Sequence, residues 1–496
     1  MKKVSLRAFS ALLMAFLIVI GLFVYIGRYI KDGEMWALYF DQSTSGSTYT
    51  LTDCNGTVLA KMGGGEKSYA ENANTRIACY HVTGDYTGNV GTGALSSFKS
   101  KLSGFNLITG IEEQEDVNLQ LTVDTDLNLK AYEALNGRKG AVMVYNYKTG
   151  EVLCMVSSPS IDPLNPPETL PDGAYINRCI SASFTPGSVF KLVTLTAALE
   201  NIDNIYHRTF SCAGSVDVKG VKINCTGVHG QQTIEQALSN SCNCAFAEIS
   251  LELGPDIIAQ YAEKLGITTS LKLDSISTQA GNYDKDSSMS AAMAWSGIGQ
   301  YNDLVCPYAM MRLAGAYANG GTVVEPSLLG QSVKTTQLLS SDTAQKVASM
   351  MNYNVVYHYG QERFPGLNIS AKTGTAEVGD GKAAHGWVVG FLAFLIFFAA
   401  FAFTFAWPGL FVSGKSLIAV PRRSQMMALI GIVRLSVLAF FLKESVLLAF
   451  PIPVLIAVLI LSVVTGIMAF SVQFLLVLPY VILVAGCVSE LVKILR

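Results

Sequence analysis

The sequence has little charge for its length. Only 15% of its 496 residues are Asp, Glu, Lys or Arg, whereas 50% are hydrophobic, and the mean hydropathy is +0.37. Soluble domains usually carry about 25% charged residues, so this composition predicts membrane segments. The net charge of -2 excludes the excess of basic residues that is typical of nucleic-acid-binding proteins.

The chain also lacks the regular Cys and His spacings of metal sites. Its 10 cysteines contain no Cys-x-x-Cys pair. The five histidines are scattered, at His81, His207, His229, His358 and His385. We therefore expect neither a metal nor another cofactor. Cys212 and Cys225 flank a predicted hairpin at residues 216–224, and the sequence is equally compatible with a disulfide between them and with two free thiols.

The N-terminus combines basic residues with a long uncharged run. Residues 8–27 carry no charge and follow Lys2, Lys3 and Arg7. About 20 apolar residues suffice for a helix to cross a bilayer. No small-x-small cleavage site follows the run, which favours an uncleaved anchor over a cleaved signal peptide. The basic flank predicts a cytoplasmic N-terminus, with the bulk of the chain outside the cytoplasm.

The polar segment after this anchor predicts a small β-rich spacer. Residues 31–116 are rich in Gly, Ser and Thr, and the alternating run at residues 48–52 precedes Asn55-Gly56, a hairpin signal. From residue 117 onward, strand-like and helix-like patterns are mixed, which predicts an α+β domain.

Ser188 stands where a loop turns into a predicted helix. A Pro-Gly break precedes it, and an apolar helical pattern continues over residues 189–199. Lys191 follows one turn later on the same face, so a possible base lies beside a possible nucleophile. The pattern alone is weak, because Ser96-x-x-Lys99 repeats it and a helix cap beside a surface lysine would look the same.

Two further motifs follow in the chain. Ser241-x-Asn243 interrupts a predicted helix at residues 233–251, where Ser and Asn are disfavoured, and so indicates a break or a functional surface. A strand-like segment at residues 369–377 contains Lys-Thr-Gly, starting at Lys372. The ordinary alternatives are a capped helix break and a solvated lysine at a strand end. A second Lys-Thr-Gly, at residues 148–150, is predicted to be a turn.

Together, the three motifs resemble the active-site signature of penicillin-binding proteins and serine β-lactamases. The flanking residues strengthen the likeness: residues 184–191 read FTPGSVFK, residues 372–377 read KTGTAE and residues 386–391 read GWVVGF. The similarity spans approximately residues 45–391. Only about 85 residues separate the anchor from the catalytic segment, too few for a further glycosyltransferase domain, so the chain resembles the class B, monofunctional type.

The resemblance implies the α+β fold that penicillin-binding transpeptidases share with serine β-lactamases, an antiparallel sheet flanked by helices. The expected domains are a cytoplasmic start and transmembrane anchor at 1–30, a small β-rich pedestal at 31–116, a complete or truncated transpeptidase domain at 117–391, and a hydrophobic multi-helix tail at 392–496. The expected location is a bacterial cell membrane, with the catalytic domain outside the cytoplasm.

The resemblance also implies an activity, that of a peptidoglycan D,D-transpeptidase. In that reaction Ser188 attacks the D-alanyl-D-alanine end of a stem peptide and forms an acyl-enzyme, and the amine of a second stem peptide takes the acyl group. Lys191 would act as the base. Ser241 would relay a proton, and Asn243 would hold the substrate amide and the Lys191 amine. The implied partners are stem peptides, β-lactam antibiotics and a membrane glycosyltransferase of the cell-wall machinery.

The remaining implied site residues surround the substrate carboxylate. Lys372 and the hydroxyls of Thr373 and Thr375 would bind that carboxylate, and Gly374 would let the strand approach the substrate closely. The backbone N–H groups of Ser188 and Thr375 would form the oxyanion hole.

The family pattern stops after residue 391. Residues 386–414 carry no charge, and the apolar stretches beyond them predict three or four transmembrane helices. A frameshifted, fused or misassembled tail is an equally open explanation. Without a closing strand and helix, the catalytic sheet would have an unpaired edge. A β-lactam sensor, a β-lactamase-like protein and an inactive product therefore remain alternatives.

Overall fold

A computed structural model describes residues 13–28, 48–102, 105–106, 110–111, 117–285, 290–379 and 383–392, all of which belong to one unit, residues 1–394. The predicted tail, apart from Leu392, lies outside these residues, as does part of the predicted anchor. Residues 13–28 are helical. Within the described ranges, no helix combines the length and the apolar character needed to cross a membrane.

A four-stranded sheet follows, with strand order β3-β2-β1-β6. Its strands are β1 (Tyr49–Thr52), β2 (Val58–Gly63), β3 (Glu66–Tyr69) and β6 (Val117–Gln120). β1 pairs antiparallel with β2 and parallel with β6. Alternation along β1 buries Tyr49 and Leu51 on one face. The carboxylate of Asp53 accepts the N–H groups of Asn55 and Thr57 at 2.9 and 2.7 Å and closes the β1–β2 turn.

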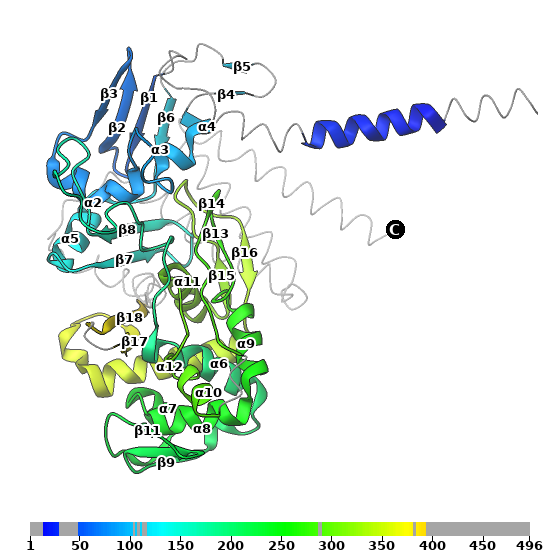
Figure 1. Cartoon of the computed structure of the whole chain (residues 1–496), viewed down its shortest axis with the longest axis vertical. Coiled ribbons are helices and arrows are strands. Elements are labelled where there is room, and N and C mark those ends of the chain that lie inside the picture. Colours follow the sequence, from blue (N-terminus) through cyan, green and yellow to red (C-terminus); the bar gives the residue numbers. More distant parts are fainter. Residues whose placement is uncertain are drawn as a thin grey trace, which may run out of the picture. The chain divides into compact units, whose positions relative to one another are not determined.

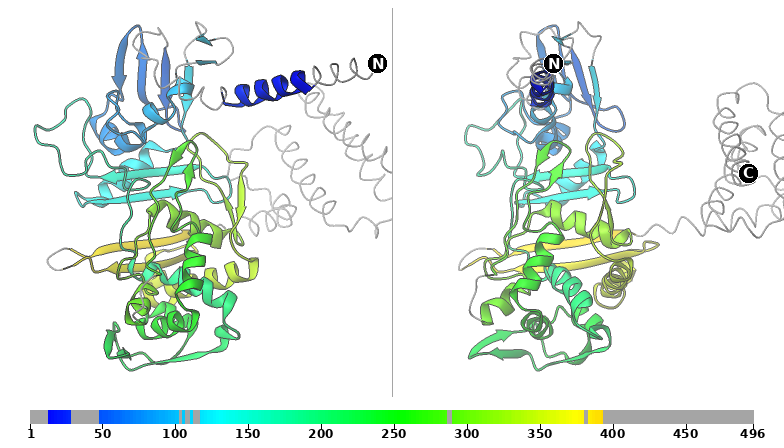
Figure 2. Two further views of the ribbon diagram at one scale, coloured as in Figure 1. Left: turned by 45° about the vertical axis from the view of Figure 1, so that its right-hand side comes forward. Right: turned by 90° about the vertical axis from the view of Figure 1, so that its right-hand side faces the viewer.

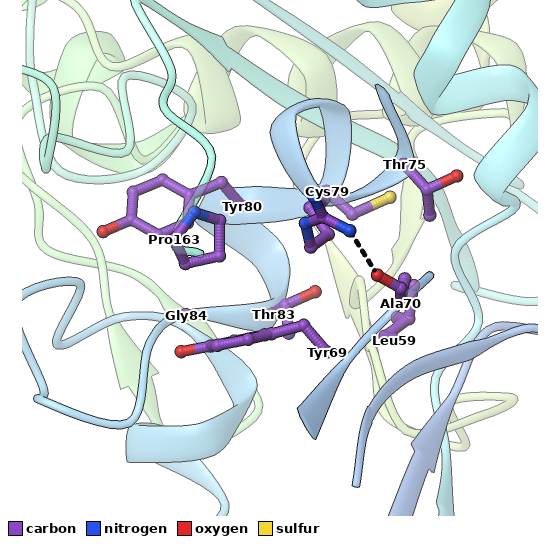
Figure 3. Close-up of a pocket in the computed structure, with 10 residues that line it drawn as sticks. Leu59, Tyr69, Ala70, Thr75, Cys79, Tyr80, Thr83, Gly84 and Pro163 are labelled. Carbon is purple, nitrogen blue, oxygen red and sulfur yellow. Dashed lines mark hydrogen bonds between the residues drawn. The ribbon is translucent and has the colours of Figure 1, made fainter. Parts of the chain in front are cut away.

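Helix α2 (Ala73–Thr83) connects this sheet to the chain that follows β8. The Arg76 guanidinium donates two hydrogen bonds to Asp162, both 2.7 Å long, and one each to the carbonyls of Ala70 and Glu71, at 2.8 and 2.7 Å. Figure 3 shows the small hollow beside this contact, with Pro163 and the hydrogen bond to Ala70 at its rim. A bidentate, largely buried ion pair holds both segments in one geometry.

The other elements are short strands around a helical core (Figure 1). The remaining strands are β4 (Phe105–Asn106), β5 (Gly110–Ile111), β7 (Gly140–Tyr145), β8 (Val152–Ser158), β9 (Thr209–Cys212), β10 (Ser215–Val218), β11 (Val221–Asn224), β12 (Gly230–Thr233), β13 (Lys272–Leu273), β14 (Ile276–Ser277), β15 (Thr322–Val324), β16 (Thr335–Gln337), β17 (Ile369–Ala376) and β18 (His385–Leu392). The helices are α3 (Ala94–Ser97), α4 (Lys99–Leu102), α5 (Thr125–Leu135), α6 (Lys191–Asn201), α7 (Ile234–Ser239), α8 (Asn243–Leu253), α9 (Pro255–Lys264), α10 (Ser290–Ser296), α11 (Pro307–Ala318), α12 (Ser341–Asn354), the 3-10 turns η1 (Gly187–Val189), η2 (Ile205–His207) and η4 (Gln361–Arg363), and the π-helix η3 (Val355–Gly360).

Helix α6 is the centre of this core. Every residue from 191 to 198 is buried, so the helix is enclosed on all sides. It packs against α8, α9 and α12, and α12 in turn packs against β17. Figure 2 shows the β17–β18 hairpin, in gold, beside these helices. The helix that carries the candidate nucleophile at its start is therefore held in place by the rest of the core.

The helix predicted at residues 233–251 is broken at its polar centre, as the sequence indicated. Its N-terminus has a capping box formed by Thr233 and Gln236. Helix α7 then ends at Ser239 and α8 begins at Asn243, and between them Ser241 adopts a left-handed backbone conformation with φ +53°. This break turns the Ser241-x-Asn243 motif toward the start of α6.

The two longest hairpins of the domain after residue 117 are separate from each other. β7–β8 and β17–β18 are each two-stranded and antiparallel, and no third strand joins them in the part of the chain that the structure describes. On β18, Val388 is 76% exposed and Leu392 is 41% exposed. Among the described residues, the sheet thus has the unpaired edge that follows from a missing closing strand.

Candidate active site

Ser188 lies in the single 3-10 turn η1 that leads directly into α6. The preceding Gly187 has φ +55°, and a Cβ there would lie 2.3 Å from the carbonyl oxygen of Thr375. Glycine is therefore required for η1 to lie against β17. The Gly187 N–H donates to the carbonyl of Gly299 at 2.8 Å, which anchors the turn from the other side.

Lys191 is fully buried and is surrounded by oxygen atoms. Its Nζ lies 3.0 Å from Ser188 Oγ, 2.8 Å from Asn243 Oδ1 and 2.6 Å from the Ser241 carbonyl oxygen. A neutral amine keeps one lone pair, which can accept the Ser188 proton while its two hydrogens remain bonded to Ser241 and Asn243. The geometry thus provides a base in direct contact with the nucleophile.

The burial of Lys191 makes a neutral amine accessible near pH 7. Desolvation lowers the pKa of Lys191 to about 7, although the nearby Cys225, Cys242 and Cys244 side chains act in the opposite direction. Desolvation also holds the pKa of Lys372 well below its usual range, and the charge of Lys191 adds to that effect. Because two positive charges in one buried site repel each other, at most one of the two amines is favoured to be protonated and charged.

Ser241 connects the two lysines. Its Oγ lies 3.3 Å from Lys191 Nζ and 3.1 Å from Lys372 Nζ. Lys372 Nζ also donates to the carbonyl of Thr373 at 2.8 Å. A hydroxyl between two amines can pass a proton from one side to the other, as the relay expected of Ser241 requires. The side chain of Asn243 is held in place by β11, because its Nδ2 donates to the carbonyl of Asn224 at 2.8 Å.

Strand β17 forms the opposite wall. Lys372 is buried, whereas the alternate residues Thr373 and Thr375 are exposed and available to a ligand. A Cβ on Gly374 would lie 2.8 Å from the carbonyl oxygen of Pro186 and 3.0 Å from the N atom of Val189. Glycine at position 374 therefore allows β17 to pack against the turn η1 that carries Ser188.

All eight predicted site residues converge on one place. Ser188 comes from η1 and Lys191 from the start of α6, while Ser241 lies between α7 and α8 and Asn243 begins α8. The other four come from β17: Lys372, Thr373, Gly374 and Thr375. The two repeated motifs lie elsewhere: Ser96 is in α3, and Lys148 is in the β7–β8 turn, where its Nζ bonds Asn319. The residues that flank these two repeated motifs do not match the family pattern, which separates them from the active-site motifs.

The predicted site residues do not include three neighbours of β17, although Trp387 belongs to the GWVVGF segment that supports the family resemblance. The N–H and the hydroxyl of Thr373 both donate to Tyr359 Oη, at 3.1 Å each. Gln300 Nε2 lies 3.4 Å from the Thr375 carbonyl oxygen, and Trp387 Nε1 donates to the Thr185 carbonyl at 2.9 Å. Tyr359 lies in a π-helix with no recognisable motif, so only the tertiary structure reveals its position.

A comparison with protein families gives one match, the penicillin binding protein transpeptidase domain, over residues 140–394, just over half of the chain. Stage V sporulation protein D of Bacillus subtilis is 28% identical over 57% of this chain and 48% of its own length. Peptidoglycan D,D-transpeptidase PbpA of Mycobacterium tuberculosis is 26% identical over 55% of this chain and 64% of its own length. The chain therefore spans about half to just under two thirds of the length of these relatives.

Solved structures show the same fold. Penicillin-binding protein A from M. tuberculosis, solved as a ceftriaxone acyl-enzyme complex, aligns with a TM-score of 0.62 at 22% identity and covers 71% of this chain and 91% of its own. The D,D-transpeptidase domain of a peptidoglycan glycosyltransferase from Eggerthella lenta aligns with a TM-score of 0.59 at 24% identity, over 70% of this chain and 91% of its own. The predicted transpeptidase fold, with mixed helices and strands, is confirmed to this extent.

Proposed function

Because this chain belongs to the penicillin-binding protein transpeptidase family, we propose that it is a serine-type peptidoglycan D,D-transpeptidase. The observation that carries the proposal is the 3.0 Å contact between Nζ of the fully buried Lys191 and Oγ of the half-buried Ser188. A serine hydroxyl is a weak nucleophile until a base removes its proton, and this contact supplies one.

The proposed reaction has two steps. Ser188 Oγ loses its proton to Lys191 and attacks the carbonyl between the two terminal D-alanines of a stem peptide. The C–N bond breaks, the last D-alanine leaves as an amine after Ser241 protonates it, and an ester with Ser188 remains. The amine of a second stem peptide then attacks that ester and restores the hydroxyl. Backbone N–H groups of Ser188 and Thr375 stabilise the oxyanion in both steps.

The substrate carboxylate is held by β17. Lys372 supplies a positive charge once the carboxylate binds, because an anion nearby raises the pKa of the amine. The exposed hydroxyls of Thr373 and Thr375 add hydrogen bonds. β-Lactam antibiotics carry a carboxylate and a reactive carbonyl and would acylate the same serine.

The family context supports two wider parts of the proposal. We propose that the protein works at a bacterial cell membrane, with its catalytic domain outside the cytoplasm, where stem peptides occur. We also propose that a membrane glycosyltransferase supplies the glycan strands. A complex of a penicillin-binding protein with MreC from Helicobacter pylori is an example of a relative that binds a partner.

A labelled penicillin tests the catalytic assignment directly. The full-length chain should become covalently labelled, Ser188→Ala should not, and Ser96→Ala, in the second Ser-x-x-Lys, should label normally. Lys372→Ala should lower the acylation efficiency about 10- to 100-fold, since hydrogen bonds to charged groups contribute about 1.5–3 kcal/mol, whereas Lys148→Ala should change nothing. Normal labelling of Ser188→Ala would refute the proposal.

The fate of the labelled protein separates a transpeptidase from a β-lactamase. Rapid deacylation needs a base that activates water, and among the described residues none of the hydrogen bonds of Lys191, Ser241, Asn243 or Lys372 involves a carboxylate. We expect the label to persist after excess penicillin is removed. Release of the label at the rate of acylation would instead indicate a β-lactamase.

A further inference from the structure

Three cysteines and one histidine meet directly behind the Ser241–Asn243 turn. Cys212 ends β9, Cys225 follows β11, His229 precedes β12 and Cys242 caps α8. Their Sγ atoms and a ring nitrogen of His229 all lie within 4.8 Å of one another. The cysteines are free thiols, including the pair Cys212 and Cys225, for which the sequence left a disulfide open.

Two distances within this cluster match the edges of a metal-centred tetrahedron. Zinc binds cysteine sulfur at about 2.3 Å and histidine nitrogen at about 2.0 Å, so tetrahedral ligands lie about 3.5–3.8 Å apart. Cys225 Sγ lies 3.7 Å from Cys242 Sγ and 3.5 Å from His229 Nδ1. With all four ligand atoms within 4.8 Å of one another, the side chains are thus already gathered around a place for a shared ion.

We propose that Cys212, Cys225, His229 and Cys242 bind one zinc ion. Soft thiolates with an imidazole in a tetrahedral arrangement select zinc over magnesium or calcium. Four protein ligands leave no open position for water or substrate, which makes the site structural. The ligands are 13, 4 and 13 positions apart in the sequence, so only Cys225 and His229 have a short spacing, and the second short pair of common zinc motifs is missing. For this reason the sequence predicted no metal.

The proposed ion would hold the catalytic turn. Cys242 stands between Ser241 and Asn243, which both contact Lys191. The Asn243 N–H donates to Cys225 Sγ at 3.1 Å, the kind of outer hydrogen bond that orients a metal-bound thiolate. One ion would therefore tie β9, the β11–β12 loop and the start of α8 together beneath the active site.

Metal content tests the site without any substrate. The full-length chain, purified in detergent with reductant and without chelator, should contain one zinc ion per chain by elemental mass spectrometry. Cobalt(II) added to the zinc-free protein should give the absorption of tetrahedral thiolate coordination. Cys225→Ser and His229→Ala should lower zinc affinity at least tenfold, since even the loss of an outer-shell partner costs about 10- to 100-fold.

The controls separate a metal site from a folding effect. Cys54→Ala removes an exposed thiol elsewhere and should retain the zinc. His229 is only partly buried, so His229→Ala should keep the wild-type circular dichroism spectrum while losing affinity. Unchanged affinity in His229→Ala, no zinc in the reduced wild type, or a Cys225–Cys242 disulfide in a metal-free protein would each overturn the proposal.

A second readout tests whether the ion holds the turn. Removal of zinc by a chelator should slow penicillin labelling at least tenfold, and added zinc should restore it. An unchanged labelling rate would overturn this part of the inference. The zinc measurement itself does not depend on the proposed function: a chain that binds zinc but is never labelled would refute only the transpeptidase assignment.

Discussion

At the scale of single residues, the chemistry depends on where each lysine lies. Lys191 and Lys372 are both 0% exposed, and an oxygen of Ser241 lies between them. A buried lysine loses its hydration shell, which penalises the charged form and makes a neutral amine available. The same residue types at Ser96 and Lys99 lie in α3 and α4 instead.

The pH dependence of acylation should report the ionisation of Lys191. Burial lowers the pKa of Lys191 to about 7. Below that pH the amine is protonated and cannot accept the Ser188 proton, so the acylation rate should fall about tenfold per pH unit. Above it the rate should level off. Penicillin labelling rates from about pH 5 to about pH 9 measure this profile, and a rate independent of pH in a protein that stays folded would contradict it.

Tyr359 should contribute to substrate binding through Thr373. Tyr359→Phe removes the oxygen that accepts the N–H and the hydroxyl proton of Thr373, so Thr373 loses its fixed orientation. Since one hydrogen bond contributes about 0.5–1.5 kcal/mol, the acylation efficiency should fall about 2- to 10-fold. Tyr357→Phe alters a 71% exposed neighbour and serves as the control. Equal labelling kinetics in both variants would exclude this role.

At the scale of elements, the site is a contact between a turn and a strand. The turn η1 carries Ser188 and β17 carries Lys372, and glycines on both sides let the two backbones meet. Gly187 faces the Thr375 carbonyl and Gly374 faces the Pro186 carbonyl. Side chains at either glycine would push the nucleophile away from the carboxylate-binding strand.

Gly187→Ala should therefore reduce penicillin labelling by more than the cost of backbone strain alone. Its φ of +55° costs a non-glycine residue about 1–2 kcal/mol. Its Cβ would also clash with the Thr375 carbonyl oxygen, and a 1 Å displacement at an active site can cost about 100-fold in rate. Gly64→Ala has a similar φ of +61° with open space around it, and should label normally. A comparable loss of labelling in both would show that strain, not contact, is responsible.

At the scale of the whole molecule, several polar contacts join the N-terminal sheet and α2 to the catalytic region. The Thr125 N–H donates to Asp53 at 3.1 Å, and His81 Nε2 lies 2.8 Å from the Ala174 carbonyl oxygen. The Arg76–Asp162 pair is one of them, linking α2 to the chain after β8 with side chains only 11% and 12% exposed. The catalytic hairpins β7–β8 and β17–β18 have no common third strand among the residues described. Stability then depends on helix packing around α6 and on such junctions.

Arg76→Ala should destabilise the chain without changing its chemistry. It leaves the Asp162 carboxylate with an incomplete set of partners, and the loss of hydrogen bonds to a charged group costs about 2–3 kcal/mol. Lys139→Ala breaks a pair that is 64% and 96% exposed and should cost less than about 0.5 kcal/mol. Urea denaturation measures both, and penicillin labelling at low temperature should be retained. Equal stability of the two variants would rule out a structural role for the junction.

The sequence by itself determined the three motifs, their order and the family. It also determined the start of α7 and the break before α8, because turns and caps depend on neighbouring residues. The burial of the lysines, the position of Tyr359 and the Cys/His cluster were decided only by the tertiary structure. Ser241 lies 50 positions from Lys191 and 131 from Lys372. A local sequence pattern does not indicate which distant segments will bury an amine away from water or bring thiols into contact.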